Sequence, residues 1–138
     1  MRQVECAGGI VVGPDKRIAV ITNQYGKHTF PKGTRKDHET EEGTARREIT
    51  EETGITNIQV VRNLGTLIRH GYTAKNGETP SVIKHIVMLH CVTDQTKLAP
   101  LAEDAKEAFW VPAGELADVL TWPEEVQFFE KNRVLLGV

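Results

Sequence analysis

Three glutamates in the middle of the chain have the spacing of a cation-binding cluster. Glu48, Glu51 and Glu52 stand at i, i+3 and i+4, so on a helix their side chains project to one side. Like charges this close repel each other, and a helix shaped only by stability would avoid them. Carboxylate oxygens grouped in this way suit a hard divalent cation such as Mg²⁺ or Mn²⁺. The alternative is an ordinary acidic helix face in contact with solvent.

A helix over residues 40–53 is needed to position these carboxylates, and both of its ends are marked in the sequence. Thr40 is a suitable N-cap, and Glu41 and Glu42 favour the positive end of the helix dipole. Gly54 follows the last periodic residue, where a left-handed C-terminal cap is expected.

The helical period places the acidic cluster beside the core. At about 100° per residue, Ala45 and Ile49 form an apolar stripe, and Glu48 and Glu52 border it. We expect Arg46 and Arg47 on the other flank. A solvated charge run would point directly away from the apolar stripe, so this arrangement favours a site.

The surrounding residues extend the cluster into a longer motif. Residues 33–55 read GTRKDHETEEGTARREITEETGI, which is Gly33, five residues, Glu39, seven residues, Arg47-Glu48-Ile49, one residue, Glu51-Glu52, one residue and Gly54-Ile55. This spacing matches the Nudix box at every fixed position, and the chain resembles the Nudix hydrolase family. The resemblance implies a Nudix-type α/β/α sandwich with a mixed β-sheet between helices, formed by residues 1–138 as a single domain.

The resemblance also implies a metal site. Glu48, Glu51 and Glu52 would bind catalytic Mg²⁺, with Mn²⁺ as a substitute, and a backbone carbonyl of Gly33 or Lys32 would add a ligand. The implied reaction is hydrolysis of a phosphoric anhydride in a nucleoside diphosphate linked to another group. Because pyrophosphate is anionic and repels a water nucleophile, a bound cation helps by neutralising phosphate oxygens and lowering the pKa of coordinated water.

The remaining catalytic roles follow from the same resemblance. Arg47 would orient the carboxylates by ion pairing, and Glu39 would support the geometry between loop and helix. Glu52 or Glu51 would serve as general base, although in parts of the family this base comes from a later loop. Candidates in that loop are Glu103, Asp104 and Glu107. Spacing does not choose among them, and each is also compatible with an ordinary exposed acid.

The residues before the motif indicate a substrate class. The sequence His28-Thr29-Phe30-Pro31-Lys32-Gly33 is similar to the subgroup that cleaves diadenosine tetraphosphate and related dinucleoside polyphosphates. Many members of that subgroup have an aromatic residue where this chain has His28. Lys32 would place a positive charge beside a polyphosphate, or it is a solvated loop lysine.

A later hairpin adds candidates for substrate binding. Arg69, His70 and Tyr72 precede an expected tip at Asn76-Gly77, and Lys84 and His85 follow it. On facing strands, these residues would line a polyphosphate channel, and Tyr72 would stack on a nucleobase or simply pack. Lys84 either faces solvent or meets phosphate, because a buried unpaired lysine is costly. Trp110 and Trp122 are expected to be packing anchors.

Composition is that of an ordinary globular enzyme. The 138 residues are 39% hydrophobic and 26% charged, with a formal net charge of −2, so no basic field attracts nucleic acid or anionic membrane. No apolar run approaches the ~20 residues of a membrane-spanning helix, and the N-terminus has no signal-peptide layout. We expect a cytoplasmic monomer or homodimer with Cys6 and Cys91 as reduced, buried thiols.

The pattern of apolar runs and turns predicts the other elements. Strands are expected at residues 4–12, 17–22, 58–68, 81–92 and 108–111, a turn at 13–16 and a loop at 23–38. Helices are expected at 113–120 and 124–135, each preceded by or beginning near a proline, Pro112 or Pro123.

The sequence therefore predicts a magnesium-dependent hydrolase of dinucleoside polyphosphates whose partner is a small nucleotide. Alternatives are a sanitising nucleoside triphosphate pyrophosphatase and a non-catalytic nucleotide-sensing domain, although sensors usually lose metal-ligand glutamates. A diphosphoinositol polyphosphate phosphohydrolase would need a dense basic surface, and an RNA-decapping subunit would need extra basic segments. Neither feature is evident in the sequence.

Overall fold

The computed structural model of the chain describes residues 1–72 and 80–138. The expected hairpin tip at Asn76-Gly77 and the side chain of Tyr72 lie outside the described residues. The strands are β1 (Arg2–Val12), β2 (Arg17–Asn23), β3 (His28–Thr29), β4 (Lys32–Thr34), β5 (Gln59–Tyr72), β6 (Pro80–Val92) and β7 (Ala105–Pro112). The helices are α1 (Glu41–Thr53), α2 (Leu116–Val119) and α3 (Pro123–Leu136).

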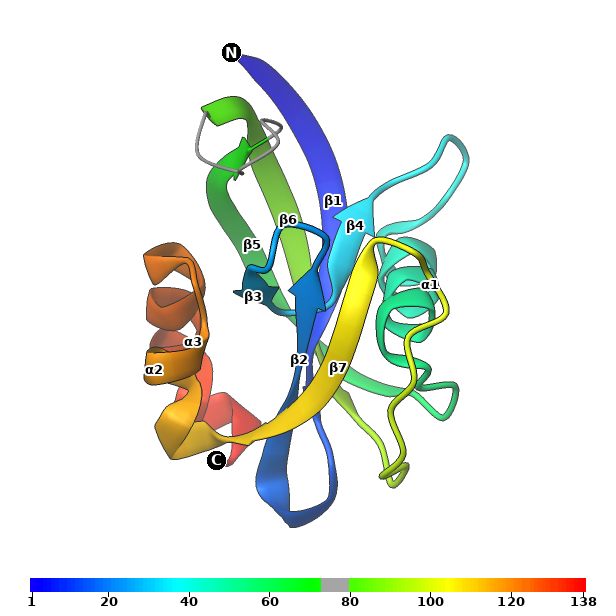
Figure 1. Cartoon of the computed structure of the whole chain (residues 1–138), viewed down its shortest axis with the longest axis vertical. Coiled ribbons are helices and arrows are strands. Elements are labelled where there is room, and N and C mark those ends of the chain that lie inside the picture. Colours follow the sequence, from blue (N-terminus) through cyan, green and yellow to red (C-terminus); the bar gives the residue numbers. More distant parts are fainter. Residues whose placement is uncertain (73–79) are drawn as a thin grey trace.

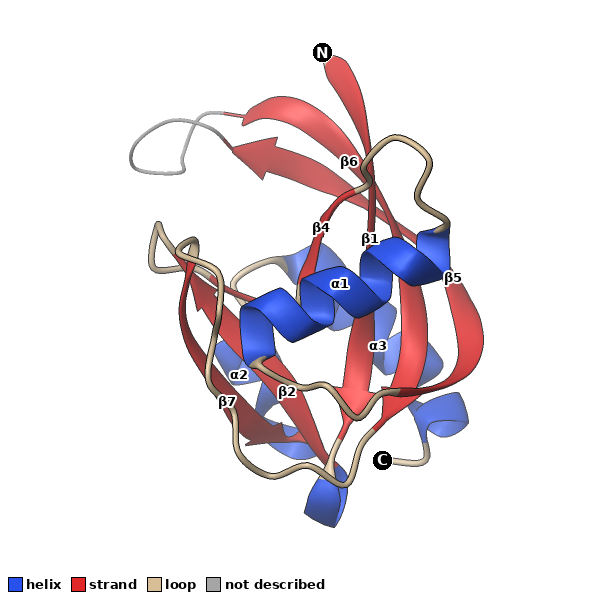
Figure 2. Ribbon diagram, turned by 90° about the vertical axis from the view of Figure 1, so that its right-hand side faces the viewer, coloured by secondary structure: helices blue, strands red, loops and turns tan. Residues whose placement is uncertain are grey.

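The strands form one mixed sheet between two helical layers. Its order is β3-β2-β1-β6-β5, with β4 paired to β1 and β7 paired to β2. The central pair β1–β6 is parallel along its length, while the other pairs are antiparallel. Helix α1 covers one face, and α2 and α3 cover the other (Figures 1 and 2). The predicted α/β sandwich with a mixed sheet is confirmed.

Alternation along the strands separates the core into two halves. On β1, Ile10 packs on the side of α2 and α3, together with Phe128 and Phe129. The next residue, Val11, packs on the opposite side with Ile49 of α1. This follows from the two-residue period of a strand, and it fixes α1 and α3 on opposite faces of the same sheet.

Both ends of α1 match the sequence signals. Thr40 Oγ1 accepts a hydrogen bond from the Gly43 amide at 3.0 Å, and Gly54 has the left-handed φ of 78° expected of a C-terminal cap. The loop before β7 then covers the last carbonyls of the helix. The amides of Leu101 and Ala102 both donate to the Glu51 carbonyl at 2.8 Å. This contact brings residues 101–104 close to the acidic side of α1.

The main departure from expectation lies in residues 28–34, which were predicted as loop. They form β3 and β4 because distant strands supply their partners: Thr29 pairs with Ile21 of β2, and Lys32 pairs with Gly8 of β1. The segment at 113–120 divides into a 3-10 turn and the short α2. As predicted, Cys6 and Cys91 are free buried thiols. No helix in the described part of the chain combines the length and apolarity needed to cross a membrane.

Candidate active site

Helix α1 and strand β4 border a pocket of about 390 Å³. Its acidic lining consists of Glu48, Glu52 and Asp104. Its basic lining includes Lys27, Lys32, Arg35, Lys36, Arg69 and Lys84. The pocket therefore brings several positive side chains together with a few carboxylates, although the whole chain has a net charge of −2. An anionic substrate bound together with a cation would fit this mixed lining.

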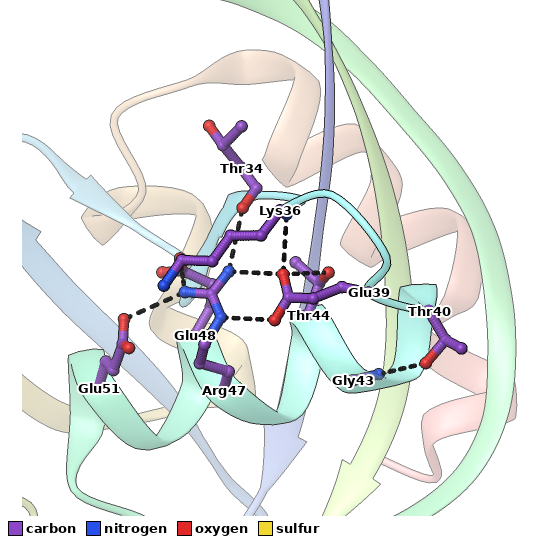
Figure 3. A network of polar contacts seen from close by, with 9 residues as sticks. All are labelled: Thr34, Lys36, Glu39, Thr40, Gly43, Thr44, Arg47, Glu48 and Glu51. Carbon is purple, nitrogen blue, oxygen red and sulfur yellow. Dashed lines mark hydrogen bonds and ion pairs between the residues drawn. The ribbon is translucent and has the colours of Figure 1, made fainter.

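Arg47 is the centre of a partly buried polar network along α1 (Figure 3). Its Nε and Nη2 atoms donate to the two carboxylate oxygens of Glu39 at 2.7 and 2.9 Å. Its Nη1 donates to Glu48 at 2.7 Å and to Glu51 at 3.3 Å. Nη2 also donates to the Thr34 carbonyl at 3.1 Å. One guanidinium thus ties the loop after β4 to two of the predicted ligands.

The placement of Arg47 corrects the helical-wheel expectation. It lies on the acidic side and not on the other flank, because Glu51 is four residues later and therefore its neighbour on the helix surface. Arg46 occupies the other flank, where its Nε donates to Glu42 at 3.0 Å and its Nη1 to the Ile58 carbonyl at 3.0 Å.

Glu39 connects the loop to the start of the helix. Beside its pairing with Arg47, its Oε1 accepts hydrogen bonds from the Lys36 amide at 2.8 Å and the Thr44 hydroxyl at 3.0 Å. The Arg47 bond first, and then the Lys36 amide, lower the pKa of Glu39 to about 2. Glu39 is therefore an ionised structural acceptor at neutral pH, and its carboxylate is engaged by the loop and by Arg47.

Glu48 lies directly against the backbone of Gly33. A Cβ added at Gly33 would overlap the Glu48 carboxylate, so only glycine allows the strand and the helix to approach this closely. Burial raises the pKa of Glu48, although the Arg47 bond opposes the shift. The motif glycine thus has a steric reason for its place before the acidic helix.

Glu52 is the most enclosed of the three glutamates, with 5% of its surface exposed. Its Oε1 accepts the Lys32 amide at 2.7 Å. Burial raises the pKa of Glu52 to about 7, and the charge of Lys32 only partly offsets this. A nearby cation would stabilise the ionised form of this buried carboxylate.

The three glutamates do not converge on one point in this arrangement. Arg47 binds both Glu48 and Glu51, whose side chain is 41% exposed, while Glu52 turns toward Lys32. In the described residues, no three histidine, cysteine or acidic side chains form a group able to hold a metal ion. The donor chemistry nevertheless fits a hard divalent cation, because Glu48 and Glu52 bring carboxylate oxygens to one pocket.

The predicted substrate residues divide into two groups. Lys32 and Lys84 line the pocket, and the charge of Lys32, followed by burial, lowers the pKa of Lys84 to about 8. His28 does not belong to the pocket lining. Its Nδ1 lies 3.0 Å from the Thr22 hydroxyl, and its ring is perpendicular to that of Phe109, with the ring centres 5.6 Å apart. The predicted contact of Tyr72 with a nucleobase falls outside the described residues.

The later acids Glu103, Asp104 and Glu107 are all exposed, but only Asp104 belongs to the lining of the pocket. Trp122 was expected to be a packing anchor, yet it borders the pocket, with the Arg69 guanidinium 5.1 Å from its ring centre. Tyr25 also borders the pocket. The turn that carries Tyr25 is marked in the sequence by Asn23, whose Oδ1 accepts the Tyr25 amide at 2.9 Å.

Comparisons with known proteins agree with this geometry. A family model described as the NUDIX domain matches residues 3–131, and no curated protein matches the chain by sequence. Among solved structures, an Ap4A hydrolase of C. elegans superposes with a TM-score of 0.78 at 20% identity, covering 97% of this chain and 98% of that chain. The MutT protein from Methanosarcina mazei Go1 superposes with a TM-score of 0.78 at 17% identity, covering 97% of this chain and 95% of that chain. The NUDIX domain of Shewanella oneidensis NrtR, complexed with ADP ribose, superposes with a TM-score of 0.75 at 16% identity, covering 99% of this chain and 90% of that chain. At these identities the structures share the fold.

Proposed function

The chain belongs to the Nudix family of pyrophosphohydrolases, and we propose that its substrates are dinucleoside polyphosphates such as diadenosine tetraphosphate. The observation that carries this proposal is the mixed lining of the pocket. Its acidic part, here called the acidic wall, includes the buried carboxylate of Glu52 and the half-buried carboxylate of Glu48. The cations of Lys32, Arg69 and Lys84 line the same pocket, so a phosphate chain bound there would have cations along its length and an acid beside the bond to be cleaved.

The acidic wall is the proposed place of a divalent cation, and magnesium is the proposed ion. Glu48 and Glu52 would hold it from the pocket lining, with Glu51 joining once its side chain leaves Arg47. When bound, the ion would neutralise phosphate oxygens and lower the pKa of a coordinated water. Arg47 keeps Glu48 in place from the other side, and Glu39 keeps Arg47 in place.

Glu52 is the stronger candidate for general base. It lines the pocket with only 5% of its surface exposed, whereas Glu51 is half exposed and ion-paired to Arg47. A base must reach the water that attacks the phosphate, and in this arrangement Glu52 and Asp104 both face that space. Asp104 is therefore the alternative base.

The dinucleoside class rests on the Phe-Pro-Lys-Gly sequence at residues 30–33 and on the fold shared with an Ap4A hydrolase. A sanitising nucleoside triphosphate pyrophosphatase is the second candidate, because the fold is equally shared with a MutT protein. A purely nucleotide-sensing role is less favoured, since Glu48, Glu51 and Glu52 are all present. Because several lysine and arginine side chains line the pocket, diphosphoinositol polyphosphates are also candidate substrates that need testing.

A substrate panel with product identification tests the proposal. The panel contains dinucleoside tetra- and triphosphates, nucleoside triphosphates, a nucleotide sugar and a diphosphoinositol polyphosphate, each with magnesium. We expect the highest kcat/KM for a dinucleoside tetraphosphate. Faster turnover of nucleoside triphosphates to a monophosphate and pyrophosphate would favour the sanitising function. Nucleotide binding without hydrolysis anywhere in the panel would favour the sensing role.

A further inference from the structure

A buried ion pair lies on the side of the pocket away from the acidic helix. Glu125 of α3 is 1% exposed and Arg69 of β5 is 5% exposed, and Arg69 Nε lies 3.1 Å from Glu125 Oε2. The Nudix motif does not include either residue. Both are buried ionisable side chains, and the catalytic proposal leaves Glu125 without a role.

Glu125 also binds the segment that leads into the motif. Its two oxygens accept the Thr29 hydroxyl at 2.8 and 2.7 Å, and Oε1 accepts the Phe30 amide at 2.9 Å. One residue further, the Pro31 carbonyl accepts the Gly9 amide at 3.1 Å. The backbone just before Lys32 is thus held by Glu125 from the α3 side and by strand β1.

The guanidinium of Arg69 has contacts on several sides. Besides the contact of Nε with Glu125, Arg69 Nη1 donates to the His70 carbonyl at 2.7 Å. The Arg69 Cζ atom lies 5.1 Å from the Trp122 ring centre. Arg69 nevertheless lines the pocket, together with Lys32 and Lys84. It is a cation whose orientation is set before any ligand arrives, which lowers the entropy cost of binding an anion.

Stability alone is a poor reason for such a pair. Removing two charges from water is costly, and well-packed apolar side chains of similar volume often stabilise a core equally well or better. Positioning is the better explanation, because Glu125 touches two groups that lead to the pocket: Arg69 and the Thr29–Phe30 backbone.

We propose that Arg69 binds the phosphate chain of the substrate and that Glu125 is the positioning residue that sets Arg69 and the backbone before Lys32. This inference rests on the proposed function of the pocket. It deepens that function by assigning the support of Arg69 to Glu125, and it gives α3 a role in substrate binding.

The test compares Arg69→Gln, Glu125→Gln and the double variant. Two readouts are used: KM and kcat with the substrate identified by the panel, and calorimetric affinity for sodium tripolyphosphate without added metal. Because a hydrogen bond to a charged group is lost, Arg69→Gln should raise KM and weaken tripolyphosphate binding by about 10- to 100-fold, with a smaller change in kcat. Glu125→Gln should shift both readouts in the same direction.

The double variant separates positioning from a merely structural role. If Glu125 acts through Arg69, its substitution adds little once Arg69 is gone, and the double variant resembles Arg69→Gln in both readouts. If the fold-losses in affinity of the two single variants instead multiply in the double variant, the positioning role is overturned. The double variant also removes both buried charges, so it is the one to measure if a single variant fails to fold. Wild-type KM and tripolyphosphate affinity in a folded double variant would overturn the whole inference.

A matched control comes from the same helix. Glu130 forms an exposed pair with Arg133 at 3.7 Å, and Glu130→Gln should leave both readouts unchanged.

The proposed function and this inference can fail independently of each other. A wild-type protein that hydrolyses nothing in the panel but binds tripolyphosphate through Arg69 would refute the proposed function alone. A wild-type protein that hydrolyses its substrate, with unaltered KM in the variants, would refute this inference alone.

Discussion

Glu52 and Glu125 accept hydrogen bonds from backbone amides only two residues apart, although they belong to helices on opposite faces of the sheet. Glu52 of α1 binds the Lys32 amide at 2.7 Å, and Glu125 of α3 binds the Phe30 amide at 2.9 Å. Because α1 and α3 lie on opposite sides of the sheet (Figure 2), the short segment before the motif is held from both helical layers. Lys32 and Gly33 owe their positions to both layers, so their geometry depends on the complete fold.

The Glu52→Gln variant tests the catalytic role of the buried carboxylate. Glutamine keeps an oxygen to accept the Lys32 amide but loses the negative charge, so hydrolysis should fall by about 10²- to 10⁴-fold while the fold survives. Thermal stability should be equal or higher, because one charge leaves a repelling, buried cluster. Steady-state kinetics and thermal melts measure the two effects. Glu42→Gln, on the same helix but exposed, is the matched control, and unchanged turnover in Glu52→Gln would remove Glu52 from catalysis.

The Gly33→Ala variant tests the close approach of strand β4 to Glu48. The added methyl group would overlap the Glu48 carboxylate, so we expect Glu48 to be displaced, stability to fall by about 1–3 kcal/mol and turnover to fall with it. Gly114→Ala is the matched control, because a Cβ there meets nothing within 4 Å in the described residues. Equal activity in Gly33→Ala and Gly114→Ala would show that the glycine is not needed for steric reasons.

Local signals were sufficient for α1 and the long strands. Thr40 and Gly54 mark the two ends of α1 through cap chemistry that involves only neighbouring residues. The parallel pairing of β1 with β6 has no such signal, since its residues are about 80 positions apart in the chain. The strands within residues 28–34 were missed for the same reason: their partners come from elsewhere in the sheet.

The part of the site that could be predicted from the sequence lies in α1 and the loop just before it. Arg47, Glu48 and Glu39 lie together as the family resemblance implies, but the catalytic and metal-binding roles of the motif residues remain predictions. The contact of Glu125 with Thr29 spans 96 residues and has no local pattern. Which of Glu103, Asp104 and Glu107 lies at the pocket depends on the path of the loop, which is held by hydrogen bonds to the Glu51 carbonyl.

Metal binding should appear as a gain in stability. A ligand that binds only the folded state adds RT ln(1 + [L]/Kd), about 2.7 kcal/mol at a concentration of 100 Kd. We therefore expect magnesium to raise the melting temperature and EDTA to reverse the rise and abolish turnover. In Glu48→Gln the gain should shrink, because a carboxylate of the pocket is lost. Turnover that persists in EDTA, or an equal gain in both proteins, would contradict metal binding at this wall.

His90 predicts how stability depends on pH. It is 5% exposed on β6, and neither of its ring nitrogens has a hydrogen-bond partner in the described residues. Burial lowers the pKa of His90, so below pH ~6.5 the unfolded chain binds a proton more readily and folding loses free energy. His90→Met should raise the free energy of unfolding by about 1–3 kcal/mol at pH 7, and the advantage over wild type should grow as pH falls from 6.5 to 5. Urea titrations of both proteins across this range measure it, and a constant difference would mean that His90 does not titrate with unfolding.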